Sequence, residues 1–364
     1  MDDCFDLSIL DTGRLSRALA IARCGYDLAI EPLSCTKLRK LMDFRARLAS
    51  AIDGTGQRPT NSELSAFGQK LFNSIIQGKV KKIYDRLPHS HIRLQIYSDL
   101  SDLQALPWEY MRESAQSAAP DVLRSIVRIV PTIGVSVPRP LKLTQRKLQL
   151  LFVQSEPIDQ GPVEWDQIKQ AIESDFKVLP DSLKMTIVQA ATRQSLLDAL
   201  DGKRFDIFHF AGHGEVAPDG TGQLLLRDLK TRKSDPVPAR ELAPILIDRG
   251  LRFVMLSACN TSAGDFTREF AVVAKSLVEA GISAVVANQF PVNNTVAAAF
   301  ARAFYNDLLR NGDLDLATTN GRKELAFNKA SLANDVARFE WGIPTLYRHA
   351  GATKVIRPIK VHDL

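Results

Sequence analysis

The later part of the chain alternates short apolar runs with amphipathic segments. The apolar runs are brief and almost unbroken, which is typical of strands buried on both faces of a parallel sheet. We expect these strands at residues 148–153, 185–190, 205–211, 253–257 and 282–287. The segments between them have helical spacing, at residues 164–176, 195–200, 239–249, 266–280 and 295–309. This alternation predicts an α/β fold, with a mostly parallel sheet flanked by helices.

The first part of the chain has a mixed pattern. Strand-like runs occur at residues 6–10, 26–30, 91–97 and 125–131, and helical spacing occurs at residues 35–52 and 61–77. The mixture predicts a smaller α+β lobe. Residues 137–140, Val-Pro-Arg-Pro, have the composition of a linker. We therefore expect an N-terminal lobe with a regulatory or docking role over residues 1–140, and the main domain over residues 141–364.

Composition narrows the class of protein. Hydrophobic residues make up 45% of the 364 positions and charged residues 24%, which favours a folded chain with a sizeable core. The net charge is +6, but the basic residues are scattered and not interleaved with aromatic residues, so we expect no direct binding of nucleic acid. No apolar run approaches the roughly 20 residues of a membrane helix, and the acidic N-terminus lacks a signal core. These features predict a cytoplasmic protein without a membrane partner.

The cysteines and the missing motifs argue against a cofactor. The four cysteines are Cys4, Cys24, Cys35 and Cys259, and no two of them form a C-x-x-C pair, so neither a zinc site nor a disulfide framework is expected. The sequence also contains no phosphate-binding loop, no G-x-S-x-G elbow and no H-E-x-x-H zinc motif. We expect no nucleotide, flavin or metal.

Two of the predicted strands lead directly into reactive side chains. His213 follows the run at 205–211, and Cys259 follows the run at 253–257. In parallel sheets, functional residues gather beyond the carboxyl ends of the strands. If these two strands are neighbours, His213 and Cys259 face one cleft.

A histidine and a cysteine suit nucleophilic catalysis. Histidine titrates near neutrality, so it can favour the thiolate and later protonate a leaving amine. Gly212 and Gly214 allow a tight turn and a close approach of substrate, and the N–H groups of Gly214 and Cys259 could bind a developing oxyanion. Taken singly, Cys259 could be an inert buried thiol and His213 a turn residue. His209 lies inside its strand and reads as a core histidine with satisfied hydrogen bonds.

The motifs around these residues resemble the signatures of the CHAT family, which comprises caspase-like peptidases related to caspases, separase and gingipains. The two motifs are His-Phe-Ala-Gly-His-Gly at 209–214 and Leu-Ser-Ala-Cys-Asn-Thr at 256–261. Supporting matches are Leu-Pro-Trp-Glu at 106–109, a hairpin at 222–226 before Ala-Arg-Glu-Leu at 239–242, Phe-Pro-Val at 290–292 and Trp-Gly-Ile-Pro at 341–344.

The resemblance implies a caspase-like fold and hydrolysis through an acyl-thioester. It makes His213 the general acid and base, makes Cys259 the nucleophile, and assigns the oxyanion hole to the backbone of Gly214 and Cys259. Many relatives have Trp-Pro-Val-Asp-Asp where this chain has Phe-Pro-Val-Asn-Asn at 290–294, which leaves the substrate preference open. Candidate residues of the substrate pocket are Glu156, Asp265, Asn288, Phe290 and Asn293.

Two of these pocket candidates have a simpler structural explanation. Asn293 could cap the helix that starts near residue 294, and Glu156 could be a solvated loop acid.

The leading hypothesis is a cysteine endopeptidase that cleaves a protein partner in a bacterial defence or cell-death system. Because the sequence has no repeat period, we expect a separate sensor protein to activate it. The alternative is a catalytically silent interaction module. The segments 215–222 and 227–235 are the stretches expected to be most exposed, for example to self-cleavage.

Overall fold

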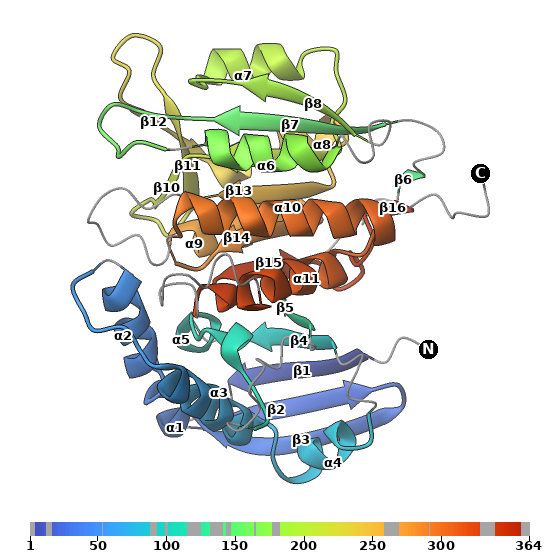
Figure 1. Cartoon of the computed structure of the whole chain (residues 1–364). Helices are drawn as coiled ribbons and strands as arrows, with labels where there is room; N and C mark the ends of the chain where they lie inside the picture. The colour runs from blue at the N-terminus through green and yellow to red at the C-terminus, as the bar shows by residue number, and fades with distance from the viewer. Residues whose placement is uncertain are drawn as a thin grey trace. The chain divides into compact units, whose positions relative to one another are not determined.

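The computed structural model describes residues 4–11, 17–52, 54–87, 93–98, 101–114, 125–131, 141–142, 147–163, 165–176, 183–257, 269–290, 292–327 and 339–357. The chain forms two compact units. The first contains residues 1–129 and 326–343, and the second contains residues 130–325 and 344–364 (Figure 1).

The first unit is built on a mixed sheet. Its strand order is β3-β2-β1-β4-β5, in which β1 pairs antiparallel with β2 and parallel with β4. The strands are β1 (Cys4–Asp11), β2 (Arg17–Cys24), β3 (Asp27–Ser34), β4 (Arg93–Ser98) and β5 (Ser125–Ile129). The helices are α1 (Cys35–Arg39), α2 (Met42–Ile52), α3 (Asn61–Ile75), α4 (Gly78–Tyr84), α5 (Ser101–Gln104), η1 (Trp108–Tyr110) and η4 (Glu340–Gly342).

Several elements of this unit differ from the sequence-based expectations, and the helices α4 and α5 were not predicted. The single helix expected at residues 35–52 is wrong, because the chain turns at Lys40 and Leu41 and divides it into α1 and α2. The strand β2 was not predicted. Its alternate residues Ala18, Ala20 and Ala22 are fully buried, but alanine contributes a weak strand signal to a sequence pattern.

The second unit contains the five strands that the alternating pattern predicted, together with β15 (Pro344–Arg348), which was not predicted. Its order is β15-β14-β13-β9-β7-β8, and all neighbours run parallel except the antiparallel β14 and β15. The strands are β7 (Leu148–Gln154), β8 (Leu183–Val188), β9 (Ile207–Ala211), β13 (Phe253–Ser257), β14 (Ala284–Asn288) and β15 (Pro344–Arg348). The expectation of a mostly parallel sheet flanked by helices is confirmed.

Helices cover both faces of this sheet because its strands are apolar on both sides. One face packs through Leu151, Phe208 and Val254 into a core shared with α7, α8 and α9. On the other face lie α6 and α10, where the Phe253 ring stacks on Phe304 at 5.2 Å between centroids (Figure 1). The helices of this unit are α6 (Asp166–Phe176), α7 (Arg193–Leu200), α8 (Ala239–Asp248), α9 (Glu269–Glu279), α10 (Asn294–Asn311) and α11 (Leu314–Phe327).

Two small sheets complete the second unit. The strands β10 (His213–Val216), β11 (Gly222–Arg227) and β12 (Ser234–Pro238) form an antiparallel sheet between β9 and α8 in the chain. This agrees with the hairpin and helix that the family resemblance implied. The short strands β6 (Leu141–Lys142) and β16 (Ile356–Arg357) pair in parallel.

A buried ion pair joins α11 to β15. The Arg348 guanidinium donates two hydrogen bonds to the Asp315 carboxylate, each of 2.8 Å, and both side chains are fully buried. Neither residue was singled out from the sequence, because an aspartate and an arginine separated by 32 residues give no local signal.

Candidate active site

Four parallel strands end at the same level of the sheet. Ala211 of β9 is paired with Gln154 of β7 on one side and with Ser257 of β13 on the other. Leu256 is paired with Ala287 of β14, so Asn288 is level with Ser257. Residues that follow these positions therefore emerge at one edge of the sheet, which is where the candidate residues were expected.

His213 is held at this edge by its neighbours. The pairing of β9 with β13 continues one residue further, because the Gly212 N–H donates to the Ser257 carbonyl at 3.3 Å. His213 is 5% exposed, and its Nε2 lies 2.7 Å from the Gly161 carbonyl oxygen. A carbonyl can only accept, so Nε2 carries a proton. In the neutral ring Nδ1 is then the basic nitrogen.

The surroundings of His213 act on its pKa in opposite directions. Burial lowers the pKa below its usual value because it disfavours the imidazolium. The hydrogen bond to the Gly161 carbonyl and the charges of Glu156 and Asp159 raise it, but by less. The resting ring is therefore neutral near pH 7, and groups that would stabilise an imidazolium are already in place.

Cys259 and Asp265 lie outside the described residues. The described part of β13 nevertheless constrains where Cys259 can start from. Ser257 is paired with Ala211, and each of the two candidate residues follows its own member of this pair by two positions. The chain thus leaves two neighbouring strand ends in the same direction to reach His213 and Cys259.

Close packing around the backbone explains the glycines on either side of His213. A Cβ atom on Gly212 would lie 2.7 Å from the Phe210 ring and 3.1 Å from the Ser155 carbonyl oxygen. A Cβ atom on Gly214 would lie 3.3 Å from the Gln223 carbonyl oxygen. Gly212 thus has no room for a side chain, and at Gly214 a neighbour would have to give way.

His209 has the satisfied, buried environment expected for it. Its Nε2 lies 2.9 Å from the Ser257 hydroxyl and its Nδ1 lies 3.0 Å from the Tyr305 hydroxyl. The side chain is fully buried, and burial lowers its pKa to about 3. His209 is therefore neutral and hydrogen-bonds to the residue two positions before Cys259.

The described pocket candidates have distinct surroundings. Glu156 is half-buried in the loop after β7, where its carboxylate accepts from the Val163 N–H at 3.3 Å. Asn288 ends β14 and is half-buried, whereas Phe290 is 1% exposed. Asn293 caps α10, because its side chain accepts from the Val296 N–H at 2.9 Å. The capping alternative for Asn293 is confirmed.

Sequence reasoning missed two groups near the edge. The Gly161 carbonyl is a backbone group, so no residue type announces it. Ser155 follows β7 and is fully buried, and its hydroxyl has no hydrogen-bond partner in the part of the chain that the structure describes. A buried hydroxyl of this kind is commonly satisfied by water or ligand.

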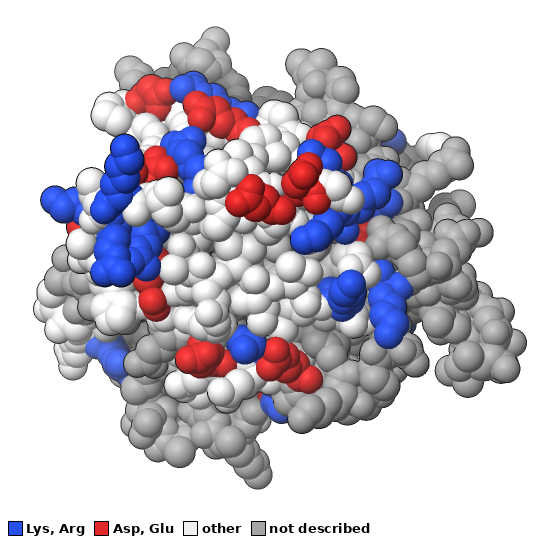
Figure 2. All heavy atoms as spheres, turned by 90° about the horizontal axis from the view of Figure 1, so that it is seen from above, with Lys and Arg blue, Asp and Glu red and all other residues white. Residues whose placement is uncertain are grey.

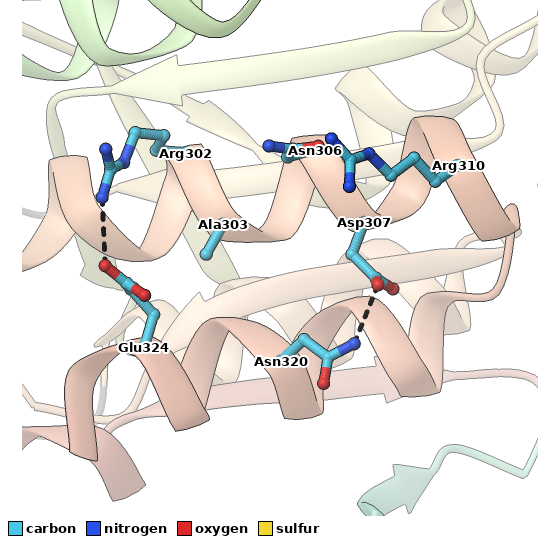
Figure 3. A pocket seen from close by; sticks show the side chains of 7 residues that line it. All are labelled: Arg302, Ala303, Asn306, Asp307, Arg310, Asn320 and Glu324. Atoms are coloured by element: carbon cyan, nitrogen blue, oxygen red, sulfur yellow. Dashed lines mark hydrogen bonds and ion pairs between the residues drawn. The ribbon is translucent and has the colours of Figure 1, made fainter. Parts of the chain in front are cut away.

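A polar groove of about 460 Å³ runs between α10 and α11 (Figure 3). Arg302 pairs with Glu324 at 3.0 Å, and the Asp307 carboxylate accepts from the Asn320 amide at 2.8 Å. The remaining lining residues are Ala303, Asn306 and Arg310. Arg302 lies nine residues beyond Asn293, about 13 Å along the helix axis. The groove is thus separate from the strand ends, and much of its charge is internally paired.

The described residues offer no obvious site for other ligands. They contain no cluster of His, Cys, Asp or Glu suited to a metal ion, and none of their helices is long and apolar enough to cross a membrane. On the face drawn in Figure 2, Lys and Arg side chains form separate groups, with acidic residues nearby, around an uncharged central area.

Comparisons with known proteins identify the fold and the family. Two crystal structures of the Saccharomyces cerevisiae separase–securin complex are similar to this chain, with TM-scores of 0.51 and 0.50 at 10% sequence identity. Each match covers 95% of this chain but only 30% of the other. The complex of Porphyromonas gingivalis RgpB pro- and mature domains matches with a TM-score of 0.43 and 12% identity, over 88% of this chain and 77% of that chain.

The likeness to separase confirms the caspase-like fold that the motifs implied. No curated protein matches the sequence significantly. The sequence does match the CHAT domain family over residues 65–349, which is more than half of its length. This protein therefore belongs to the CHAT-domain family.

Proposed function

We propose that this chain is a cysteine endopeptidase in which His213 and Cys259 act as one catalytic pair. The observation that carries the proposal is the register of β9 against β13, which starts both residues from paired positions at one sheet edge. The hydrogen bond from His213 Nε2 to Gly161 supports it, because it leaves Nδ1 as the nitrogen available to the thiol.

The proposed reaction begins with transfer of the Cys259 thiol proton to His213. The thiolate attacks the carbonyl carbon of the scissile peptide bond, and the oxyanion accepts hydrogen bonds from the N–H groups of Gly214 and Cys259. The imidazolium then protonates the leaving amine as the C–N bond breaks. Water, deprotonated by His213, hydrolyses the acyl-thioester and regenerates the thiol.

The electrostatics of the site suit this cycle. Burial keeps His213 neutral at rest, so the ring can accept a proton. The imidazolium that forms is stabilised by the Gly161 carbonyl and by the charges of Glu156 and Asp159. These contributions are already oriented before the reaction, which is the condition under which electrostatic groups lower a barrier most.

The substrate and the setting are also proposed. We assign a protein substrate whose P1 side chain is bordered by Glu156, Asn288, Phe290 and Asp265, in a cytoplasmic defence or cell-death system switched on by a separate protein. The solved separase is in complex with securin, which supports a protein partner for this chain. The N-terminal region up to residue 140 is the proposed docking and regulatory lobe.

Covalent capture tests the proposal. The full chain, with and without cell extract, is treated with peptidyl acyloxymethyl ketones that differ at P1, and the adduct is measured by intact mass and peptide mapping. We expect an adduct on Cys259 that is lost in Cys259→Ala, greatly slowed in His213→Ala and retained in the control Cys24→Ala. Labelling of Cys24 but never of Cys259 would favour the silent interaction module instead.

A further inference from the structure

The loop that holds His213 is fastened to the tip of the β11–β12 hairpin. The Ile158 N–H donates to the Arg232 carbonyl at 2.9 Å. The Asp159 carboxylate accepts from the Ser234 N–H at 2.8 Å and from its hydroxyl at 3.0 Å, and Gln160 Nε2 donates to the same hydroxyl at 3.1 Å. Successive residues of the loop are thus bound to one end of the hairpin.

The next residue of the loop is the partner of His213. The Gly161 carbonyl accepts from His213 Nε2 at 2.7 Å, directly after the residues bound by the hairpin. The loop is thus a short continuous segment that is hydrogen-bonded to the hairpin tip through residues 158–160 and to the histidine through Gly161. A displacement of the hairpin tip by a small distance would move the carbonyl that sets the orientation of the ring.

The hairpin tip is free on its outer side. The strand next to it is anchored, because Arg193 of α7 pairs with Asp235 at 2.8 Å. The tip itself presents Leu229, which is 74% exposed, and the adjoining loop presents Ile158, which is 62% exposed. Large apolar side chains this exposed are a normal feature when single, but here two lie on segments joined by a backbone hydrogen bond.

The tip also carries three basic side chains. Lys230, Arg232 and Lys233 are exposed, and none of them forms an ion pair within the described residues. The one acidic residue at the tip, Asp228, already accepts hydrogen bonds from the N–H groups of Lys230 and Thr231, at 3.1 and 2.7 Å. With three basic residues and one acidic residue, the tip 228–234 carries a net positive charge.

The backbone of the tip is also strained. Arg232 has φ of 61°, a left-handed conformation that is uncommon for a residue with a side chain. The carbonyl of this residue is the one that holds Ile158. Strain of this kind persists where surrounding contacts over-determine the backbone, and it is frequent at switch regions.

We propose that the hairpin tip 228–234, together with Ile158, is the docking surface for an acidic segment of a protein partner, and that its occupancy adjusts His213 through the loop 157–161. The basic side chains would pair with the carboxylates of the segment, and an apolar residue of the segment would cover Leu229 and Ile158. A single-stranded nucleic acid fits less well, because bases are bound by stacking on aromatic rings and residues 228–234 contain none. The regulatory consequence rests on the proposed peptidase function, whereas the docking surface and the coupling do not.

Binding is tested with the full chain and labelled peptides by fluorescence anisotropy. The probes are a peptide rich in Glu and Leu, the same peptide with Gln for Glu, the same peptide with Ser for Leu, and a uridine oligonucleotide. We expect salt-sensitive binding of the first probe only, weakened about tenfold in Lys230→Glu/Lys233→Glu and several-fold in Leu229→Ser. The control Lys37→Glu/Lys40→Glu makes the same change in net charge on exposed residues of the first unit, and we expect it to leave the affinity unchanged.

Preference for the oligonucleotide, or equal loss in the control variant, would overturn the docking surface.

Coupling is tested in the Cys259→Ala background by amide hydrogen exchange of residues 157–163 and by the NMR signal of the His213 ring. We expect the acidic peptide to slow exchange there and shift the ring signal. Ser234→Ala, which removes both hydrogen bonds of the Ser234 hydroxyl to the loop, should speed exchange and reduce the response. If the peptide changes neither the hydrogen exchange of the loop nor the His213 ring signal, the coupling is refuted. An unreactive Cys259 would refute only the peptidase proposal.

Discussion

One histidine lies inside β9 and a second lies just beyond its end, and their hydrogen-bond environments differ. Each ring nitrogen of His209 is within hydrogen-bond distance of a hydroxyl group, and the side chain has no contact with solvent. In His213, four residues later, one ring nitrogen is hydrogen-bonded to a carbonyl, and acidic groups lie close enough to raise the pKa of the ring. Satisfied hydrogen bonds on both sides make a histidine a structural element, whereas one fixed nitrogen and one basic nitrogen make it fit for proton transfer.

The largest expected effect separates the two histidines by activity. We expect His213→Ala to lower turnover of a cleavable peptide about 10²–10⁴-fold, which is the usual contribution of a positioned acid and base. The measurement is single-turnover cleavage at saturating substrate, with circular dichroism to check folding. A variant that keeps most of its turnover would remove His213 from the reaction.

The second effect separates them by stability. We expect His209→Ala to lower the free energy of unfolding by about 3–5 kcal/mol, because it leaves a cavity and strips the Ser257 and Tyr305 hydroxyls of a buried partner. Urea unfolding of His213→Ala should show a loss nearer 1 kcal/mol. The conservative variant His209→Gln, which keeps a hydrogen-bonding group, should recover part of the loss. Equal losses at both positions would contradict the contrast.

The same contrast has a pH signature. The folded-state pKa of His209 is lowered to about 3 from 6.5, so its contribution to stability is complete above pH 6.5 and is lost as the pH falls towards 3. At 1.36 kcal/mol for each unit, the loss is of the order of 5 kcal/mol. Urea unfolding at several pH values should show a flatter dependence for His209→Gln than for the unaltered chain.

A smaller effect concerns Asn293 at the other end of the edge. We expect Asn293→Ala to lower the free energy of unfolding by about 1 kcal/mol through loss of the α10 cap. Asn293→Asp should retain the cap. If the role of Asn293 is confined to capping, the rate of Cys259 labelling should be the same in all three proteins, and a slower rate in Asn293→Asp would assign it to the pocket as well.

The smallest expected effect is on the pKa of His213. Glu156→Gln removes a negative charge that raises this pKa, so we expect the pKa to fall. The acid limb of the activity profile should move to lower pH. NMR titration of the His213 ring in the Cys259→Ala background measures the direct effect, and an unchanged pKa would show that the Glu156 charge does not reach the ring.

Much of the fold was predictable because the central strands are apolar on both faces. Uninterrupted runs such as 253–257 gave both the strands and their order of alternation with helices. The position of His213 followed from the same pattern, since it comes directly after such a run. The parts that failed lack this signal: β2 is rich in alanine, and the division of residues 35–52 into α1 and α2 depends on a turn that helical spacing alone does not reveal.

The candidate site was predictable only in its side chains. Histidine and cysteine are unusual enough at strand ends to be noticed, and the register of β9 against β13 gives them a common edge. The Gly161 carbonyl, the buried Ser155 hydroxyl and the fastening of the loop to Ser234 depend on backbone groups and tertiary contacts. No residue type in a sequence identifies such contacts in advance.

The central claim is that His213 and Cys259 are chemically coupled. The most direct test is the rate of Cys259 alkylation by iodoacetamide as a function of pH, compared between the unaltered chain and His213→Ala. The account predicts fast alkylation well below the ordinary cysteine pKa of about 8.5, because neutral His213 accepts the thiol proton, and it predicts that this reactivity is lost when His213 is removed. An ordinary thiol titration that is identical in both proteins would contradict it.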